Sequence, residues 1–449
     1  MEKIYSLQRM AAWAMSLFRI FLLFNLCIWL ISVNQAVAES LADTLVRLVE
    51  SPEEAQSLNP PGFVETLNKL SLSPEDRGMA MKLPYQLKKI GVGMPQKEAD
   101  ILVKLNKNPG TIKFACMAPL GTPWAKYIRE VPKAFRKRMG DIIRIESYIG
   151  LSLGNDPDYV RKMASGSLEA AGITTWGMKY ISKEIGVYEL PFLFETYGEA
   201  DYVVKKTWPV FVEKFREKGF VLVPTPMEVG FLQVYSTKKI IKTPDDLLGA
   251  KYGCWMGDVE IATIKQLGIN PVVFTVLELP SSLATNIIQS QSSPTMYMVG
   301  AQILSFIEKG GGCSGVNMFY PPGGLVYKEE NMINAALSNI TKSEQQVLIK
   351  YVDEITAMFN EMLEKVAPML TRELREGNKK LIESLQQKGM AVYIPSMEER
   401  KIWKQKTRPV WDELVGKIYS QETLDRVLKA KSEYRATHPE EFESYKWEP

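Results

Sequence analysis

The chain has 449 residues and a formal net charge of +3, and 46% of its residues are hydrophobic, enough for the cores of two domains or lobes. A charge so close to neutral argues against nucleic acid as a partner. The single histidine, His438, excludes the Ser-His-Asp and Cys-His types of catalytic site and most zinc and iron sites. We therefore expect no catalytic residues, no metal and no cofactor.

Residues 1–38 have the layout of an export signal. The basic residues Lys3, Arg9 and Arg19 accompany a short apolar run at 20–33, and the small-x-small pattern at 36–38 suits a signal peptidase. We predict a cleaved signal peptide at 1–38 and a periplasmic mature protein with a net charge of +1. An uncleaved membrane anchor is the alternative, although the run is shorter than the ~20 residues of a spanning helix.

Residues 39–109 predict a small helical N-terminal extension. Ser51-Pro52 and Ser73-Pro74 each place a capping hydroxyl before a proline and acidic residues, which is typical of a helix start. No catalytic pattern occurs in this segment. A docking module for a partner is the alternative interpretation.

From residue 110 the chain alternates between strand and helix patterns. We predict strands at 111–117, 142–148 and 169–174, with helices at 123–139 and 156–164 between them. This order indicates a mostly parallel sheet covered by helices. Ligands bind at the carboxyl ends of the strands in such sheets, so the loops at 118–122 and 174–177 should share one crevice.

A second α/β unit follows the extended segment 228–235. It contains a short helix at 243–248, a strand at 250–255, a helix at 259–267 and a strand at 271–275. Two such units joined by an extended crossing predict an α/β, two-lobed periplasmic-binding-protein fold with a hinge. We place lobe 1 at 110–235 and lobe 2 at 236–330.

Residues 331–449 predict C-terminal helices that pack on both lobes. Thr341 and Glu344 form a capping box, and an apolar stripe at helical spacing continues from Val347 to Met369. The stripe favours a long helix that braces both lobes. A helix for a coiled-coil partner is the alternative, which Pro368 weakens by interrupting the pattern.

Six segments, in the same order along the chain, resemble the DctP-type solute-binding proteins of tripartite ATP-independent periplasmic (TRAP) transporters. They are residues 113–126, 156–174, 189–194, 243–255, 283–296 and 408–419, and the resemblance extends over about residues 111–435. It implies a signal peptide, a two-lobed fold with a long helix across both lobes, and sodium-driven TRAP membrane subunits as partners. The expected function is an extracytoplasmic receptor for a small-molecule organic ligand, not an enzyme.

One position departs from this resemblance in a way that bears on the ligand. Proteins of this type most often hold an organic acid with an arginine in the strand after the Pro-Asp-Asp-Leu helix, and Gly253 stands there in this sequence. Neither Gly253 nor Lys251 supplies the bidentate pair that a guanidinium makes with a carboxylate. We expect a ligand other than a simple dicarboxylate, and carboxylate affinity if arginine is introduced at 253.

Aromatic side chains surround the predicted crevice, which favours a largely apolar ligand with a few hydrogen-bonding groups. The predicted ligand-binding residues are Trp124, Thr174, Trp176, Phe231, Trp255 and Tyr297. An exported ligand sensor or scaffold with the same fold but no transport role is the alternative function. A hydrolase that uses Glu228 and Asp258 as acid and base is a third reading, which depends on a separation that the sequence does not give.

Overall fold

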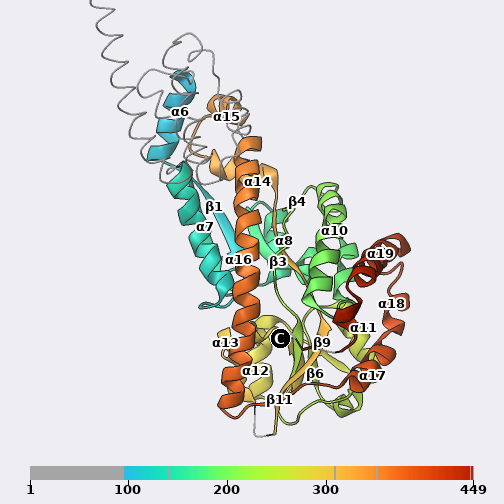
Figure 1. The fold of residues 1–449 in the computed structure, drawn as a ribbon. Coiled ribbons are helices and arrows are strands. Elements are labelled where there is room, and N and C mark those ends of the chain that lie inside the picture. The colour runs from blue at the N-terminus through green and yellow to red at the C-terminus, as the bar shows by residue number, and fades with distance from the viewer. Residues whose placement is uncertain (1–95, 140–141, 308–309, 350–351, 445, 448) are drawn as a thin grey trace, which may run out of the picture. The chain divides into compact units, whose positions relative to one another are not determined.

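The computed structural model describes residues 96–139, 142–307, 310–349, 352–444, 446–447 and 449 (Figure 1). The predicted signal peptide and most of the predicted extension, residues 1–95, lie outside this range. Within the described residues, no helix is both long and apolar enough to cross a membrane. The described chain divides into two compact units, the first at 96–110, 133–144 and 336–361 and the second at 111–132, 145–335 and 362–449.

The first unit contains α6 (Gln96–Lys107) and α15 (Lys342–Leu348). The amide of Asn339 donates to the main-chain carbonyls of Asn108 and Pro109, at 3.3 and 2.9 Å. Lys104 Nζ lies 3.0 Å from Glu344 Oε2. The capping box predicted between Thr341 and Glu344 is confirmed at the start of α15.

The second unit holds two mixed sheets, and the first has the strand order β2-β1-β3-β10-β4. Its strands are β1 (Gly110–Cys116), β2 (Ile143–Ile149), β3 (Ala170–Thr174), β4 (Val221–Leu222) and β10 (Gly323–Tyr327). β1 and β3 run parallel, whereas β10 lies antiparallel between β3 and β4. The chain thus returns to the first sheet at Gly323, inside the stretch that the sequence assigned to lobe 2.

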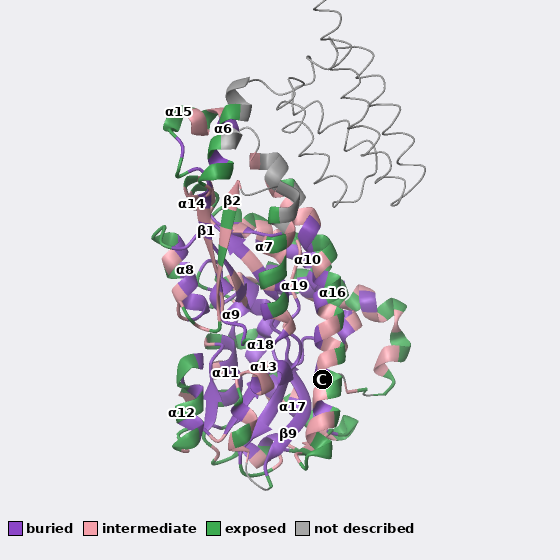
Figure 2. Cartoon of the chain, turned by 90° about the vertical axis from the view of Figure 1, so that its left-hand side faces the viewer, coloured by how far each residue is buried: buried purple, intermediate pink, exposed green. Residues whose placement is uncertain are grey.

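The second sheet has the order β11-β9-β5-β8-β6-β7. Its strands are β5 (Leu232–Ser236), β6 (Tyr252–Cys254), β7 (Pro271–Val273), β8 (Ser290–Ser293), β9 (Gly312–Phe319) and β11 (Ala391–Tyr393). β5, which the sequence assigned to lobe 1, pairs antiparallel with β8 and β9 in this sheet. The four inner strands of this sheet, β9, β5, β8 and β6, are buried, whereas α12 (Leu279–Ala284) is half exposed (Figure 2).

Helices flank both sheets, and their bounds follow the predicted caps closely. α8 begins at Asp156 after its cap Asn155 and ends at Ala164, as predicted. The helices and 3-10 turns between β1 and α15 are α7 (Pro123–Met139), α8 (Asp156–Ala164), α9 (Thr175–Met178), η1 (Lys183–Glu189), α10 (Tyr197–Arg216), η2 (Pro244–Leu247), α11 (Asp258–Gln266), η3 (Val276–Glu278), α12, α13 (Thr295–Gly300), η4 (Ile303–Phe306) and α14 (Glu329–Ala336).

We call the first sheet with its helices the first lobe and the second sheet with its helices the second lobe. Two crossing segments, residues 223–231 and 320–322, connect them within the second unit. They are short and extended, so they can act as a hinge.

A long C-terminal helix, α16 (Val352–Gln387), contacts both lobes (Figure 1). Its Glu373 accepts a hydrogen bond from Tyr127 Oη in the first lobe at 2.8 Å. Its Asn378 accepts one from the main-chain N–H of Met296 in the second lobe at 3.1 Å. α17 (Met397–Thr407), α18 (Pro409–Glu413), α19 (Gln421–Thr437) and η6 (Pro439–Phe442) follow. The predicted long helix is confirmed, and Pro368 lies inside it.

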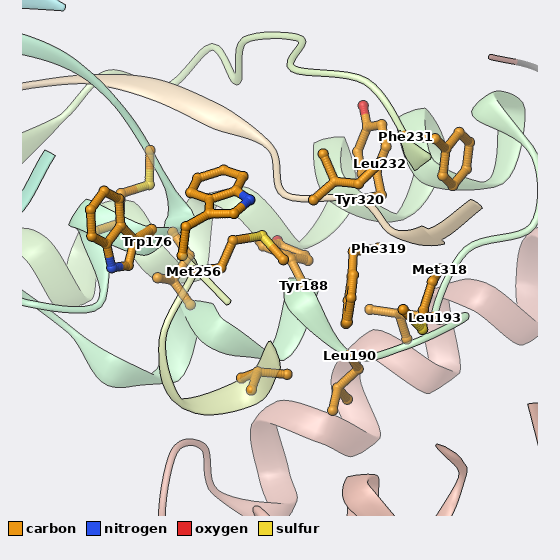
Figure 3. Close-up of a cluster of buried hydrophobic side chains, with 14 of the residues drawn as sticks. Trp176, Tyr188, Leu190, Leu193, Phe231, Leu232, Met256, Met318, Phe319 and Tyr320 are labelled. Atoms are coloured by element: carbon orange, nitrogen blue, oxygen red, sulfur yellow. The ribbon is translucent and has the colours of Figure 1, made fainter. Parts of the chain in front are cut away.

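One hydrophobic cluster runs through both lobes. Figure 3 shows a part of it, with side chains from α9 and η1, from the loop after β6, and from the ends of both crossing segments. Tyr188 packs against Trp208 and Phe211 there, at 6.2 and 5.1 Å between ring centroids. The lobes therefore share a continuous hydrophobic core at the hinge.

Candidate functional site

The lobes meet through the loops that follow their strands. The loop after β1 contacts the end of α13: a Cβ added at Gly300 would lie 2.9 Å from Thr122 Cγ2 and 3.0 Å from Pro119 Cβ. Cβ atoms do not approach other heavy atoms so closely, so a larger residue at 300 would push the lobes apart locally. Gly300 thus permits a direct lobe-to-lobe contact.

Two of the predicted binding residues, Trp176 and Trp255, form the centre of a second lobe-to-lobe contact. Their rings lie edge to face, with centroids 6.0 Å apart and planes at 88°. Trp176 lies in α9, and the side chain of the helix cap, Thr174, accepts a hydrogen bond from the Trp176 main-chain N–H. Trp255 follows β6, and its indole N–H donates to the Ser292 carbonyl of β8 at 2.8 Å. The Trp176 main chain and the Trp255 indole are thus each held within their own lobe, and the two rings meet between the lobes.

A buried ionic group lies beside this tryptophan pair. Lys179 of the first lobe is paired with Glu189 and also donates to the Met256 carbonyl of the second lobe at 2.7 Å. Glu260 accepts hydrogen bonds from the main-chain N–H groups of Trp255 and Met256 at 2.7 and 2.9 Å. Burial raises the pKa of Glu260 to about 8, because a charged carboxylate loses its hydration there. Burial also raises the pKa of Glu189, although Lys179 opposes this effect.

A third contact joins the start of α7, a crossing segment and α16. The Trp124 indole donates to the Glu228 carbonyl at 2.8 Å. Arg375 of α16 binds Glu228 Oε2 through Nε at 2.9 Å and forks onto Asp201, at 2.9 and 2.6 Å. The arginine also lies over the Tyr197 ring, with Cζ 3.9 Å from the centroid. The Arg375 guanidinium is therefore already paired with two carboxylates, those of Glu228 and Asp201.

The remaining predicted residues have different surroundings. Thr174 donates its hydroxyl to the buried Asp156 at 2.8 Å, and burial raises the pKa of that carboxyl to about 7. Phe231 is buried between Tyr197 and Tyr320, with centroids at 4.8 and 5.1 Å, in the hinge core and apart from Trp176 (Figure 3). Tyr297 is half-buried on α13, next to Met296. The structure thus brings Trp176 and Trp255 together, but not all six residues.

The surroundings of Gly253 argue against the expectation that an arginine there would bind a carboxylate. A Cβ at Gly253 would lie 2.8 Å from Phe274 Cε1 and 2.9 Å from two carbons of Ile288. The position faces a packed hydrophobic layer, so an arginine at 253 would first have to displace these two side chains. Lys251 is exposed and donates to the Asn286 carbonyl at 2.9 Å.

Sequence reasoning missed Lys179, Glu260 and Arg375 at these contacts. Glu260 carried a weak signal, an acidic residue in the first turn of a helix after Gly257. Arg375 carried none, because its partners lie 147 and 174 residues away along the chain. In the part of the chain that is described, no group of three or more His, Cys, Asp or Glu residues is placed to hold a metal ion.

Comparison with known proteins gives one family. Residues 114–307 and 335–418 match the family model described as bacterial extracellular solute-binding protein, family 7. Among curated proteins, the uncharacterised protein YiiZ of Salmonella typhimurium is 26% identical over 205 residues, 40% of this chain and 62% of that protein. A solute-binding protein of Verminephrobacter eiseniae is 25% identical over 173 residues, 38% of this chain and 51% of that protein. The matched part thus spans only about half to three fifths of these relatives.

Solved structures share the fold at low sequence identity. A TRAP periplasmic solute-binding protein from Ralstonia eutropha, with bound 2-acetolactate, has a TM-score of 0.62 and 19% identity, and covers 73% of this chain and 99% of its own. The sugar acid binding protein of Advenella mimigardefordensis, in complex with galactonate, has a TM-score of 0.60 and 22% identity, with 73% and 99% coverage. A Shewanella oneidensis protein with bound succinate has a TM-score of 0.59 and 18% identity, with 72% and 99% coverage.

Proposed function

The chain belongs to family 7 of the bacterial extracellular solute-binding proteins, and we propose that it is the periplasmic receptor of a TRAP-type secondary transporter. The observation that carries this proposal is the meeting of strand-end loops from two lobes, with Trp176 against Trp255. In a hinged receptor, a ligand that touches both lobes stabilises their closed arrangement. The membrane subunits of the transporter would then recognise the closed form.

The proposed ligand is a small, largely apolar organic molecule and not a simple dicarboxylate. Lys179 and Arg375, which lie at the lobe contacts, are already paired with the buried carboxylates Glu189 and Glu228. A ligand carboxylate would have to displace one of these, which leaves a buried charge unpaired. Gly253 offers no cation in their place. The residues proposed to contact the ligand are Trp124, Thr174, Trp176, Phe231, Trp255 and Tyr297. Of these, Trp176, Phe231 and Trp255 are buried and must first be uncovered by hinge opening.

Location and partners belong to the same proposal. Residues 1–38 would be removed on export, and the mature protein would act in the periplasm with TRAP membrane subunits and without catalysis of its own. The near-neutral mature charge supports a partner other than nucleic acid.

The proposal is tested by calorimetry with purified mature protein and by native mass spectrometry of protein isolated from its own cells. We expect a co-purifying small molecule without two carboxylates, and no heat of binding with succinate or galactonate at micromolar concentration. Trp255→Ala should weaken binding of the co-purifying molecule by at least about tenfold, about 1.4 kcal/mol, because the indole contributes a large apolar surface. Tyr180→Ala, an exposed aromatic of the first lobe, is the matched control.

Two outcomes would contradict parts of this proposal. Micromolar affinity for succinate would overturn the ligand class and leave the receptor role standing. Ligand binding without any loss of solute uptake when the gene is deleted would favour the exported sensor or scaffold instead.

A further inference from the structure

Trp447, in the C-terminal segment, lies against the hinge side of the second sheet, near the chain end that is marked in Figure 1. The indole N–H of Trp447 donates to Gln233 Oε1 of β5 at 3.1 Å and to Asn317 Oδ1 of β9 at 3.2 Å. The two accepting side chains are fully buried, with 0% and 1% exposure. An indole bound by two buried amide oxygens is held in one position and orientation.

The sheet is shaped to receive this ring. Strand pairing between β5 and β9 shifts between Leu232 and Val234, so β9 bulges opposite Gln233. Asn317 takes a left-handed conformation in the bulge, with φ +51°, which turns its amide out of the ordinary strand direction. At Gly315, a Cβ would lie 2.5 Å from the Trp447 atoms Cε2 and Nε1. Only glycine therefore leaves room for the indole.

The same segment also contacts the first lobe. The Tyr197 hydroxyl donates to the main-chain carbonyl of Pro449 at 3.1 Å. Tyr197 opens α10, which packs on β4 of the first sheet. Its ring contacts Phe231 and Tyr320, one from each crossing segment, at 4.8 and 6.2 Å between centroids. Trp447 and Pro449 thus contact the second and the first lobe, respectively, beside both hinge strands.

We propose that Gln233, Gly315 and Asn317 form an indole-binding seat at the hinge, and that Trp447 in this seat and Pro449 against Tyr197 together act as a strap that holds the two lobes in their present arrangement. The seat depends only on the hydrogen bonds and packing of the Trp447 indole. The strap rests on the hinged motion of the proposed function, because a strap matters only if the lobes open. Opening would then require release of the indole or of the Tyr197 contact.

The seat is tested by hydrogen exchange at the indole N–H groups of protein labelled with ¹⁵N-tryptophan. Trp447→Phe identifies the resonance by its loss. We expect the Trp447 N–H to exchange at least about tenfold more slowly than a free indole, because it must break two hydrogen bonds to reach water. Gly315→Ala should abolish this protection by filling the ring's place. Gln233→Leu, which removes one acceptor and adds no bulk at Gly315, should reduce it. Exchange at the free rate in the parent protein would overturn the seat.

The strap is tested by electron-spin distance measurements between labels at Tyr180→Cys in the first lobe and Val273→Cys in the second, both exposed positions. Trp255→Ala, which removes a direct lobe contact, serves as the opening control. We expect Trp447→Ala and a chain ending at Glu443 each to add a population of longer distances absent from the parent, whereas the exposed neighbour Lys446→Ala should not.

The outcomes separate the two proposals. If Trp255→Ala lengthens the distances and Trp447→Ala does not, the strap is wrong and the hinged receptor stands. If neither variant changes the distances, the hinged motion itself is wrong, and the strap with it, whatever the indole exchange shows.

Discussion

A side chain at position 253 would share its space with Phe274 and Ile288, both buried in the second lobe. β6 is three residues long and lies between β7 and β8, so its backbone has little freedom to shift away from them. The close packing of Phe274 and Ile288 therefore explains the glycine at 253 as well as the loss of a ligand contact does. A cation for the ligand would have to come from another element.

Gly253→Arg is accordingly expected to destabilise the protein and to create no carboxylate site. Overpacking costs about 1–3 kcal/mol, and burial of an unpaired guanidinium adds to this. Urea unfolding measures the loss, and calorimetry with succinate should show no heat. Lys251→Arg, two residues away and exposed, should leave stability unchanged. Micromolar succinate binding by a stable Gly253→Arg protein would show that the side chain does reach the interlobe space.

On the scale of elements, α16 makes a charged contact with a crossing segment through Arg375 and Glu228. Glu228 is buried, with its side chain 1% exposed, and Arg375 is its cationic partner. Burial raises the pKa of Glu228 while the arginine opposes the shift. Removal of the arginine would leave a carboxylate in the protein interior without its counter-charge.

Arg375→Met should therefore lower the free energy of unfolding by about 3–5 kcal/mol at neutral pH, the usual result of breaking a buried ion pair from one side. Arg375→Met combined with Glu228→Gln should recover part of the loss, because the charge that lacks a partner is gone. Arg372→Met, on the same helix at an exposed position, is the control. Equal losses for Arg375→Met and Arg372→Met in denaturant titrations would mean that the pair contributes nothing.

Elements defined by local signals were predictable from the sequence, and their assembly was less so. Caps and apolar spacing located α8 and α15, because these signals act within a few residues. The sheet membership of β5 and β10 depends on pairing with distant strands, so the sequence did not show which sheet each strand joins. The Trp176 and Trp255 contact followed from strand-end loops, whereas Lys179 reaches Met256 across 77 residues that no local pattern connects.

For the molecule as a whole, buried acids make stability depend on pH. Burial raises the pKa of Asp156 to about 7 and that of Glu260 to about 8, from ordinary values of 3.8 and 4.5. Glu195 is shifted the other way: despite burial, its ion pairs with Lys404 and Arg435 lower its pKa to about 2. The first two groups bind protons more tightly in the folded protein, and the third less tightly.

These shifts predict that the free energy of unfolding is greatest near pH 4 and falls toward pH 8. Above about pH 4 the folded protein keeps a proton on Asp156 up to about pH 7 and on Glu260 up to about pH 8, whereas the unfolded chain releases both. Rising pH within these ranges therefore favours unfolding by up to about 1.4 kcal/mol per pH unit for each group. Below pH 4.5, protonation of Glu195 in the unfolded chain removes the stability that its ion pairs provide.

Urea unfolding at pH 5, 6.5 and 8 measures the slope of the unfolding free energy against pH. Glu260→Gln keeps an acceptor for the Trp255 and Met256 N–H groups and should flatten it, whereas the exposed Glu440→Gln should not. A slope unchanged by Glu260→Gln would mean that Glu260 is ionised in the folded protein, held by Lys179.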